Sequence, residues 1–341
     1  MEPNKDFNKV FELVQKISSD VEKLCGFPSY ITNYGKEIGL PYLKFDNDGF
    51  SSLTFNGKIN VLIKYNKDKN QCLFSAPIGP IPTENSNEFF KKILISNAFG
   101  IENGGAVLGI ERETYRLIIS YIFVASCFSY TLFRTVLLNF VNVVDDWQTK
   151  YDNLIGSYYK EKPKMRFKNL YIKRREFSFN FDFSKFISES KIENADISHY
   201  ISKYGKEIGL PNLSFKNNNV CSLKFDDKLD VDIVYNKENN QCIFASPIGY
   251  IPDYPSEVYF KHLLSSNAFG TETGGAMLGI EVENNRIVLA YNFISNICSY
   301  ELFRTALKNF VNLAEEWQIK HKYLCEARFS FQSDLSKYIS F

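Results

Sequence analysis

The sequence from Ser96 to Glu111 reads SNAFGIENGGAVLGIE, and the sequence from Ser266 to Glu281 reads SNAFGTETGGAMLGIE. Each copy begins at the end of an apolar helical pattern, passes through a glycine turn and enters a strand-like run. Repetition of this kind decides the fold, because it indicates that one structural unit is built twice.

The repeat extends far beyond these two stretches, from Tyr30–Leu154 in the first copy to Tyr200–Leu324 in the second. The two copies align at a constant offset of 170 positions without a gap. Because each copy is far longer than the roughly 20–45 residues of a solenoid repeat, each is predicted to be a whole domain. The predicted segments are an N-terminal helix (1–28), a first domain (29–154), a basic linker with an aromatic extension (155–198), a second domain (199–325) and a C-terminal aromatic tail (326–341).

Apolar periodicity predicts the order of elements within each copy as helix, three strands, helix, two strands, helix. In the first copy the predicted elements are a helix over 30–38, strands over 51–55, 59–65 and 71–76, a helix from 86, strands over 106–110 and 116–124, and a helix from 130 to about 150. Asn56-Gly57 predicts a tight hairpin, and Pro77–Pro82 is expected to take the chain out of the sheet. Hairpin connections without crossover helices predict an α+β fold with antiparallel-rich sheets.

Composition excludes several classes of protein. A formal net charge of +1 provides no overall field to attract nucleic acid or an anionic membrane. The N-terminus carries charges where a signal peptide would be apolar, and no apolar run approaches the ~20 residues that span a bilayer. Seven cysteines without a close Cys-x-x-Cys pair argue against disulfides and zinc. We therefore expect a cytoplasmic protein without membrane insertion.

No catalytic constellation recurs in the two copies. The three histidines, His199, His262 and His321, have no histidine at the matching positions of the first copy. Glu111 and Glu281 share a position, but neither has a second acid at a matching distance. Adjacent acids in the last helix of each copy point in different directions, so they do not converge on a substrate. The sequence predicts no enzyme, no cofactor, no metal site and no small-molecule substrate.

The assembled motifs resemble the type III secretion chaperone family typified by the Tir chaperone, often called the CesT family. The matching pieces in the first copy are YGKEIGL (34–40), the run from Cys72 to Pro82, ENGG (102–105), LGIE (108–111) and the last helix through Trp147. The second copy matches at the same places. The resemblance covers about 125 residues twice, and it rests on the order and spacing of these pieces.

The resemblance implies a homodimeric binding protein that holds an extended N-proximal segment of a secreted effector without ATP. This chain departs from the family by being a tandem fusion, which implies an internal pseudo-dimer, and by not being acidic overall. Secretion-apparatus components are a further candidate partner, and the bacterial cytoplasm is the expected location. The pseudo-dimer interface carried over from the family comprises Phe89, Phe90, Ile93, Leu94, Asn97, Tyr259, Phe260, Leu263, Leu264 and Asn267.

The candidate cargo surface comes from the first helix and the sheet of each copy, with many of its members expected in the core. Its members are Ile31, Tyr34, Ile38, Leu53, Phe55, Val61, Ile63, Ile201, Tyr204, Ile208, Leu223, Phe225, Val231 and Ile233. Two aromatic segments, 177–188 and 329–340, match each other; they either pack on their own domains or occupy a binding groove when cargo is absent. The alternative function is an effector or regulatory protein that uses this fold as an interaction module.

Overall fold

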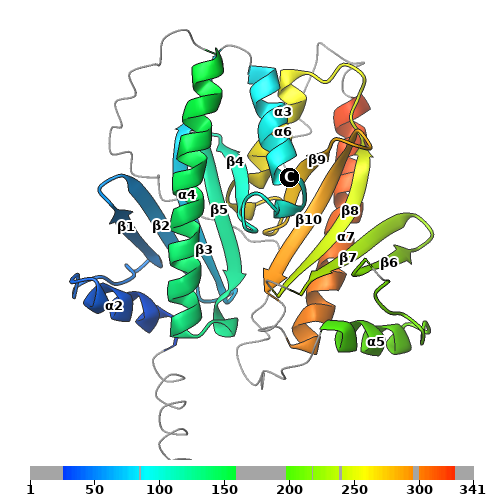
Figure 1. Cartoon of the computed structure of the whole chain (residues 1–341), viewed down its shortest axis with the longest axis horizontal. Coiled ribbons are helices and arrows are strands. Elements are labelled where there is room, and N and C mark those ends of the chain that lie inside the picture. The colour runs from blue at the N-terminus through cyan, green and yellow to red at the C-terminus, as the bar shows by residue number, and fades with distance from the viewer. Residues whose placement is uncertain are drawn as a thin grey trace, which may run out of the picture.

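The computed structural model describes residues 26–83, 86–158, 197–216, 218–237, 240–294 and 299–326. Two similar halves lie side by side, with α3 and α6 between the two sheets (Figure 1). The helix α4 crosses the near face of the first sheet, whereas α7 lies behind the second (Figure 1). The halves are therefore related by a pseudo-twofold axis that runs vertically in this view.

The first unit has the predicted order of elements. They are α2 (Pro28–Glu37), β1 (Phe50–Phe55), β2 (Ile59–Asn66), β3 (Gln71–Pro80), α3 (Ser86–Asn97), η1 (Ala98–Gly100), β4 (Val107–Glu111), β5 (Arg116–Val124), η2 (Ala125–Cys127) and α4 (Tyr130–Tyr158). The sheet has five strands in the order β1-β2-β3-β5-β4, and every pairing is antiparallel.

The second unit repeats this arrangement. Its elements are α5 (Ile197–Glu207), β6 (Val220–Phe225), β7 (Leu229–Asn236), β8 (Gln241–Tyr250), α6 (Glu257–Asn267), η4 (Ala268–Gly270), β9 (Met277–Glu281), β10 (Arg286–Ile294) and α7 (Tyr300–Glu326). Its sheet order is β6-β7-β8-β10-β9. The predicted α+β class and the duplicated element order are confirmed.

The expectation that the chain leaves the sheet at Pro77 is wrong. β3 continues to Pro80 and pairs with β5 along its whole length, with a bulge between Pro77 and Gly79. On its other side, β3 is paired with β2 only as far as Ser75. Beyond that point β3 is bordered by a strand on one side alone, and proline is tolerated at such an edge because its missing N–H leaves no ladder bond unmade.

The turn between β1 and β2 differs chemically between the units. Asn56 and Gly57 have φ angles of 50° and 65°, and Asp226 and Asp227 have φ angles of 46° and 57° at the equivalent positions. Left-handed backbone is unfavourable for residues that carry a Cβ, and glycine avoids this cost. We expect Asp227→Gly to raise the free energy of unfolding by about 1 kcal/mol in chemical denaturation. The reverse change, Gly57→Asp, is the matched control and should lower it; a destabilised Asp227→Gly protein would contradict the prediction.

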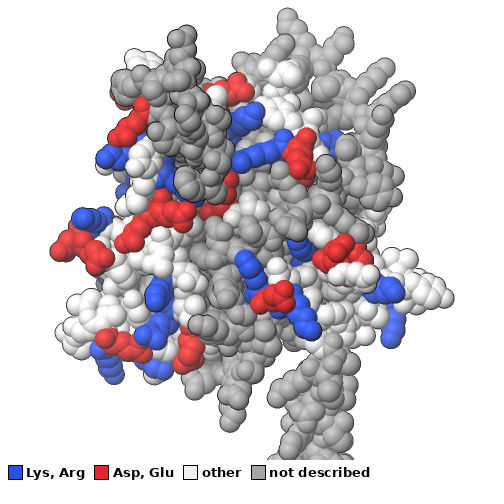
Figure 2. Space-filling view, turned by 180° about the vertical axis from the view of Figure 1, so that it is seen from behind, with Lys and Arg blue, Asp and Glu red and all other residues white. Residues whose placement is uncertain are grey.

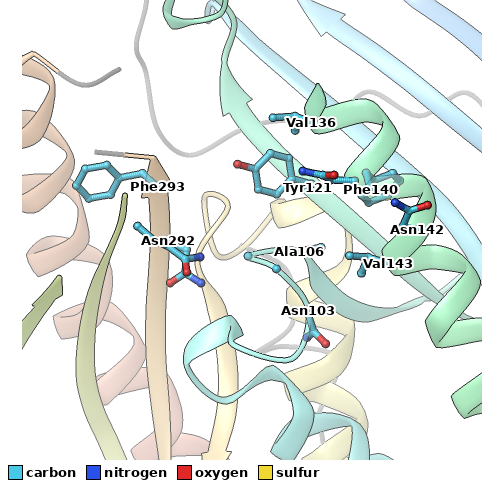
Figure 3. Close-up of a pocket in the computed structure, with 13 residues that line it drawn as sticks. Asn103, Ala106, Tyr121, Val136, Phe140, Asn142, Val143, Asn292 and Phe293 are labelled. Carbon is cyan, nitrogen blue, oxygen red and sulfur yellow. The ribbon is translucent and has the colours of Figure 1, made fainter. Parts of the chain in front are cut away.

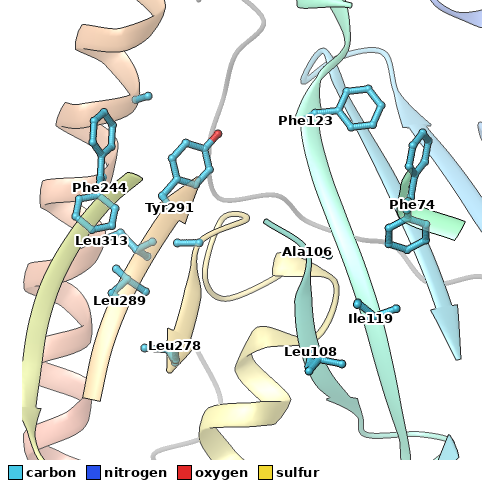
Figure 4. Close-up of a cluster of buried hydrophobic side chains, with 14 of the residues drawn as sticks. Phe74, Ala106, Leu108, Ile119, Phe123, Phe244, Leu278, Leu289, Tyr291 and Leu313 are labelled. Carbon is cyan, nitrogen blue, oxygen red and sulfur yellow. The ribbon is translucent and has the colours of Figure 1, made fainter. Parts of the chain in front are cut away.

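One cluster of buried apolar side chains runs through both units. In Figure 4, Phe74 and Phe123 mark its part in the first unit, and Phe244 and Tyr291 mark its part in the second. Burying apolar surface stabilises by roughly 25 cal/mol per Å². Because the core is continuous across the two units, their docking belongs to the folded state of the chain.

The predicted N-terminal helix, most of the basic linker and both matching aromatic segments fall outside the described residues. At the borders of these segments, Pro28 begins α2, α4 extends to Tyr158, and Ile197 begins α5. No helix of the described chain is long and apolar enough to cross a membrane.

Candidate binding surfaces

Both copies of the duplicated stretch, residues 96–111 and 266–281, lie at the junction between the units, together with α3 and α6. α3 contacts α6 and β9, and α6 contacts β4. All ten side chains of the predicted interface set are buried. They belong to α3 and α6, the two helices that lie at the junction (Figure 1).

Two glycines allow the backbones of the two units to approach each other closely. A Cβ placed on Gly109 of β4 would lie 2.6 Å from the backbone N of Ala268, and one on Gly279 of β9 would lie 2.6 Å from the backbone N of Ala98. Neither glycine has a positive φ angle. These positions therefore need glycine because of the space that the other unit occupies.

Asn97 and Asn267 tie each connecting helix to its own edge strand. The Asn97 Nδ2 donates to the Leu108 carbonyl at 2.8 Å, and its Oδ1 accepts from the Leu108 N–H at 2.9 Å. Asn267 makes the same pair of bonds to Leu278. Each asparagine thus satisfies backbone groups of a strand at the sheet edge, as a neighbouring strand would.

Polar contacts across the junction differ between its two ends. Arg112 pairs with Glu272 at 2.8 Å, and the Lys261 ammonium lies 4.4 Å from the centre of the Tyr115 ring. The equivalents of Arg112 and Tyr115 in the second unit are Val282 and Asn285. The polar contacts across the junction therefore do not follow the pseudo-twofold symmetry of the backbone.

Nine of the fourteen candidate cargo residues lie in the core and have almost no accessible surface. These nine are Ile31, Tyr34, Leu53, Val61, Ile63, Ile201, Leu223, Val231 and Ile233. Phe55, Tyr204 and Phe225 are half-buried, and Ile38 and Ile208 are exposed. The accessible candidates therefore lie at the end of the first helix of each unit and at the ends of β1 and β6.

The two exposed isoleucines belong to longer apolar runs. Ile38 is followed by Leu40, which is 49% exposed, and by Tyr42, which is 92% exposed. In the second unit Ile208 is followed by Leu210, which is 49% exposed. Leu40, Tyr42 and Leu210 were not predicted as site residues, although the first lies in the motif YGKEIGL that supported the family resemblance. Exposed apolar side chains in a matching place on both units suggest a binding surface.

Each sheet has one edge strand at the junction between the units and one edge strand at the outside of the molecule. β4 and β9 lie at the junction, whereas β1 and β6 are the outermost strands of their sheets (Figure 1). Each outer strand pairs with one strand only in the described sheet. A strand edge of this kind can accept an extended peptide through main-chain hydrogen bonds.

A cavity of about 450 Å³ lies between the units. The first unit contributes the glycine turn Asn103–Ala106, Tyr121 of β5 and Phe140 of α4, and the second contributes Asn292 and Phe293 of β10 (Figure 3). Burial raises the pKa of Tyr121 to about 12, so its hydroxyl stays protonated at neutral pH. None of the described residues that line the cavity is charged.

The titratable groups of the described chain show no arrangement for metal binding, because no three His, Cys, Asp or Glu side chains gather among the described residues. Cys72 and Cys242 are fully buried in their sheets, and burial raises the pKa of both thiols. On the face shown in Figure 2, acidic and basic side chains are interspersed, without a broad area of one sign among the described residues.

The model of the Tir chaperone protein (CesT) family matches residues 29–148 and again residues 199–318. The chain belongs to this family. The matched regions follow the two structural units, each beginning within its first helix and ending within its last. The family resemblance predicted from the sequence is confirmed.

The two relatives below each match no more than one unit's length of the chain. A Chlamydia pneumoniae protein, CPj0713/CpB0740, is 31% identical over 85 residues, which is 24% of this chain and 65% of that protein. The transcriptional anti-antiactivator ExsC of Pseudomonas aeruginosa is 24% identical over 122 residues, 36% of this chain and 83% of ExsC.

Among the solved structures that are similar to part of the chain are two complexes. The ExsC–ExsE complex contains a chain of 24% identity and TM-score 0.33, with 36% of this chain and 90% of that chain covered. The structure of the Yersinia pestis type III secretion chaperone SycH with a fragment of YscM2 contains a chain of 16% identity and TM-score 0.30. Here 36% of this chain and 99% of that chain are covered.

Proposed function

We propose that this chain is an ATP-independent chaperone of the bacterial cytoplasm that binds an extended N-proximal segment of a secreted effector and keeps it competent for export. Its membership of the Tir chaperone family, matched once in each unit, is the observation that carries this proposal. Binding of this kind needs accessible apolar surface and free main-chain groups, and it needs no catalytic group.

The outer edges β1 and β6 are the proposed docking strands, and the exposed residues Ile38, Leu40, Tyr42, Ile208 and Leu210 are the proposed apolar contacts. An extended cargo segment would add to a sheet edge while its side chains cover these residues. Fusion of the two units supplies both surfaces in one chain, since docking is then intramolecular and independent of protein concentration.

The first test identifies proteins of the native host that co-purify with the full chain, and then measures binding of their purified N-terminal segments to it. We expect Leu40→Asp combined with Leu210→Asp to weaken binding at least about tenfold, because burying one leucine contributes roughly 1.5–3 kcal/mol. Both side chains are half-exposed, so the fold should persist.

Ile319→Asp is the matched control, because Ile319 is 59% exposed and belongs to α7, outside the outer strands and the first helices. It should leave the affinity unchanged. If no purified secreted segment binds the wild-type chain, the proposed function is wrong. If the double variant binds as tightly as wild type, the proposed surface is wrong.

The similarity to ExsC supports a second candidate, a regulatory protein that uses the fold as an interaction module. ExsC is a transcriptional anti-antiactivator, and its match covers 36% of this chain. A regulator of this kind would bind another regulatory protein, and its removal would change transcript levels while leaving effector stability intact. Measuring both in a deletion strain distinguishes the two functions.

A further inference from the structure

The cavity between the units has an unused hydrogen-bond acceptor. Asn292 is 9% exposed, and its Nδ2 donates to the Phe99 carbonyl across the junction at 3.0 Å. Its Oδ1 is buried and has no hydrogen-bond partner in the described structure. Leaving a buried acceptor without a hydrogen bond is unfavourable, and a donor placed in the cavity would remove that cost.

The other buried asparagine that lines the cavity, Asn103, has no such capacity. Asn103 accepts a hydrogen bond from the Trp147 indole at 2.9 Å, and its Nδ2 donates to the Ser96 carbonyl and to Asn97 Oδ1. Its hydrogen bonds hold the glycine turn against α4. Asn292 is therefore the residue whose chemistry points to a ligand.

The rest of the lining selects for an uncharged group with an apolar body. The rings of Tyr121, Phe140 and Phe293 contribute to the walls (Figure 3). Because the described lining carries no charge, a lysine, an arginine or a carboxylate would lose its hydration without gaining a counter-charge. A phenol or an indole satisfies both requirements, since each combines a ring that packs on other rings with one O–H or N–H donor.

The equivalent place on the other side of the pseudo-twofold axis has an apolar side chain where the cavity has Asn292. Ile122 occupies the position that corresponds to Asn292, and its side chain packs against Gly270 and Gly275. Gln71, the equivalent of Gln241 in the cavity wall, is fully buried. Divergence of the two copies has therefore made the site asymmetric, and an asymmetric site can specify the orientation of a bound polypeptide.

We infer that this cavity binds a tyrosine or tryptophan side chain of the bound polypeptide, with the O–H or N–H donating to Asn292 Oδ1. The inference rests on the proposed chaperone function, because it assigns the side chain to the cargo. The exposed Gly104, Asn139 and Asn142 leave the cavity accessible along α4. A polypeptide on that surface can insert one side chain while its main chain stays outside.

The test titrates the full chain with the N-acetyl amides of tyrosine, tryptophan and phenylalanine and follows binding by NMR. We expect the tyrosine and tryptophan amides to bind about tenfold more tightly than the phenylalanine amide, because one hydrogen bond contributes about 1.4 kcal/mol. Equal affinities of the three amides, or no binding at millimolar concentration, would overturn the inference and leave a water-filled cavity.

Asn292→Ile should abolish the preference for the donor-bearing amides, since Ile122 is accommodated at the equivalent place. Asn142→Ala should weaken binding, whereas Asn312→Ala, the equivalent change on α7, is the matched control and should have no effect. If Asn292→Ile does not fold, the ratio of the affinities of the tyrosine and phenylalanine amides for the wild-type chain still tests the inference.

Failure of this inference is distinguishable from failure of the proposed function. If the wild-type chain binds a purified secreted segment and Asn292→Ile binds it equally tightly, the cavity holds no cargo side chain and the chaperone function stands. If the wild-type chain binds no secreted segment, the chaperone function falls, and with it the assignment of the side chain to cargo.

Discussion

Replacing Gly109 with alanine is expected to disrupt the docking of the two units. The new methyl group would lie 2.6 Å from the backbone N and 2.7 Å from the Cα of Ala268. Backbone atoms cannot turn aside as a flexible side chain can, so α6 and η4 must move away from β4. Overpacking of this kind typically costs about 1–3 kcal/mol, and we expect the upper end of that range because two backbones meet.

The prediction is checked by thermal denaturation together with small-angle scattering of the folded protein. Gly279→Ala should have the same effect, because its Cβ would meet the backbone N of Ala98 at 2.6 Å. Gly39→Ala is the control: Gly39 has open space around it, so only the left-handed backbone at φ 79° opposes the change. If the Gly109→Ala protein has the wild-type melting temperature and radius of gyration, the docking of the two units does not depend on this contact.

The duplicated stretch allowed the fold class to be predicted from the sequence. Its constant offset showed that a whole unit recurs, and the alternation of apolar residues located β5 at Arg116–Val124, where the structure has it. Periodicity works in such elements because one face is buried and the other is not. The extension of β3 past Pro77 could not be predicted this way, because the tolerance for proline depends on where β2 ends.

The candidate cargo surface was harder to predict, since an apolar residue in a strand has the same sequence pattern whether it faces the core or a partner. Val61 and Ile63 were candidates, yet both are fully buried. Leu40 and Tyr42 follow the first helix in a turn, where periodicity carries no information, and their exposure is visible only in the folded chain. Asn292 could have been noticed by comparing the two copies, since the equivalent position in the first copy holds the apolar Ile122.

Acidification is expected to destabilise this protein through a histidine that only the second unit has. His321 is 5% exposed, its Nε2 lies 2.9 Å from the Tyr259 hydroxyl, and its ring packs over Gly249. Burial lowers the pKa of His321 to about 4. In the first unit the same place holds Tyr151, which packs over Gly79 and donates a hydrogen bond to the Pro80 carbonyl.

The direction of the effect follows from the two pKa values of His321. In the unfolded chain the imidazole takes up a proton as the pH falls through about 6.5, whereas in the folded chain it stays neutral until about pH 4. The buried neutral imidazole therefore makes its full contribution to the free energy of unfolding above about pH 6.5. That contribution is lost as the pH falls from about 6.5 to 4. The free energy of unfolding should fall by roughly 2 kcal/mol between pH 7.5 and pH 5.

Transplanting the first-unit pair into the second unit tests this assignment. The double variant Tyr259→Phe, His321→Tyr reproduces Phe89 and Tyr151, and urea denaturation at pH 7.5 and pH 5 should show that most of the acid-induced loss has disappeared. Burial also lowers the pKa of His262, so a smaller loss in the same direction will remain. His199→Gln replaces an exposed histidine and should leave the wild-type loss intact. An unchanged loss in the double variant would mean that other groups take up the protons, because no imidazole would then remain at position 321.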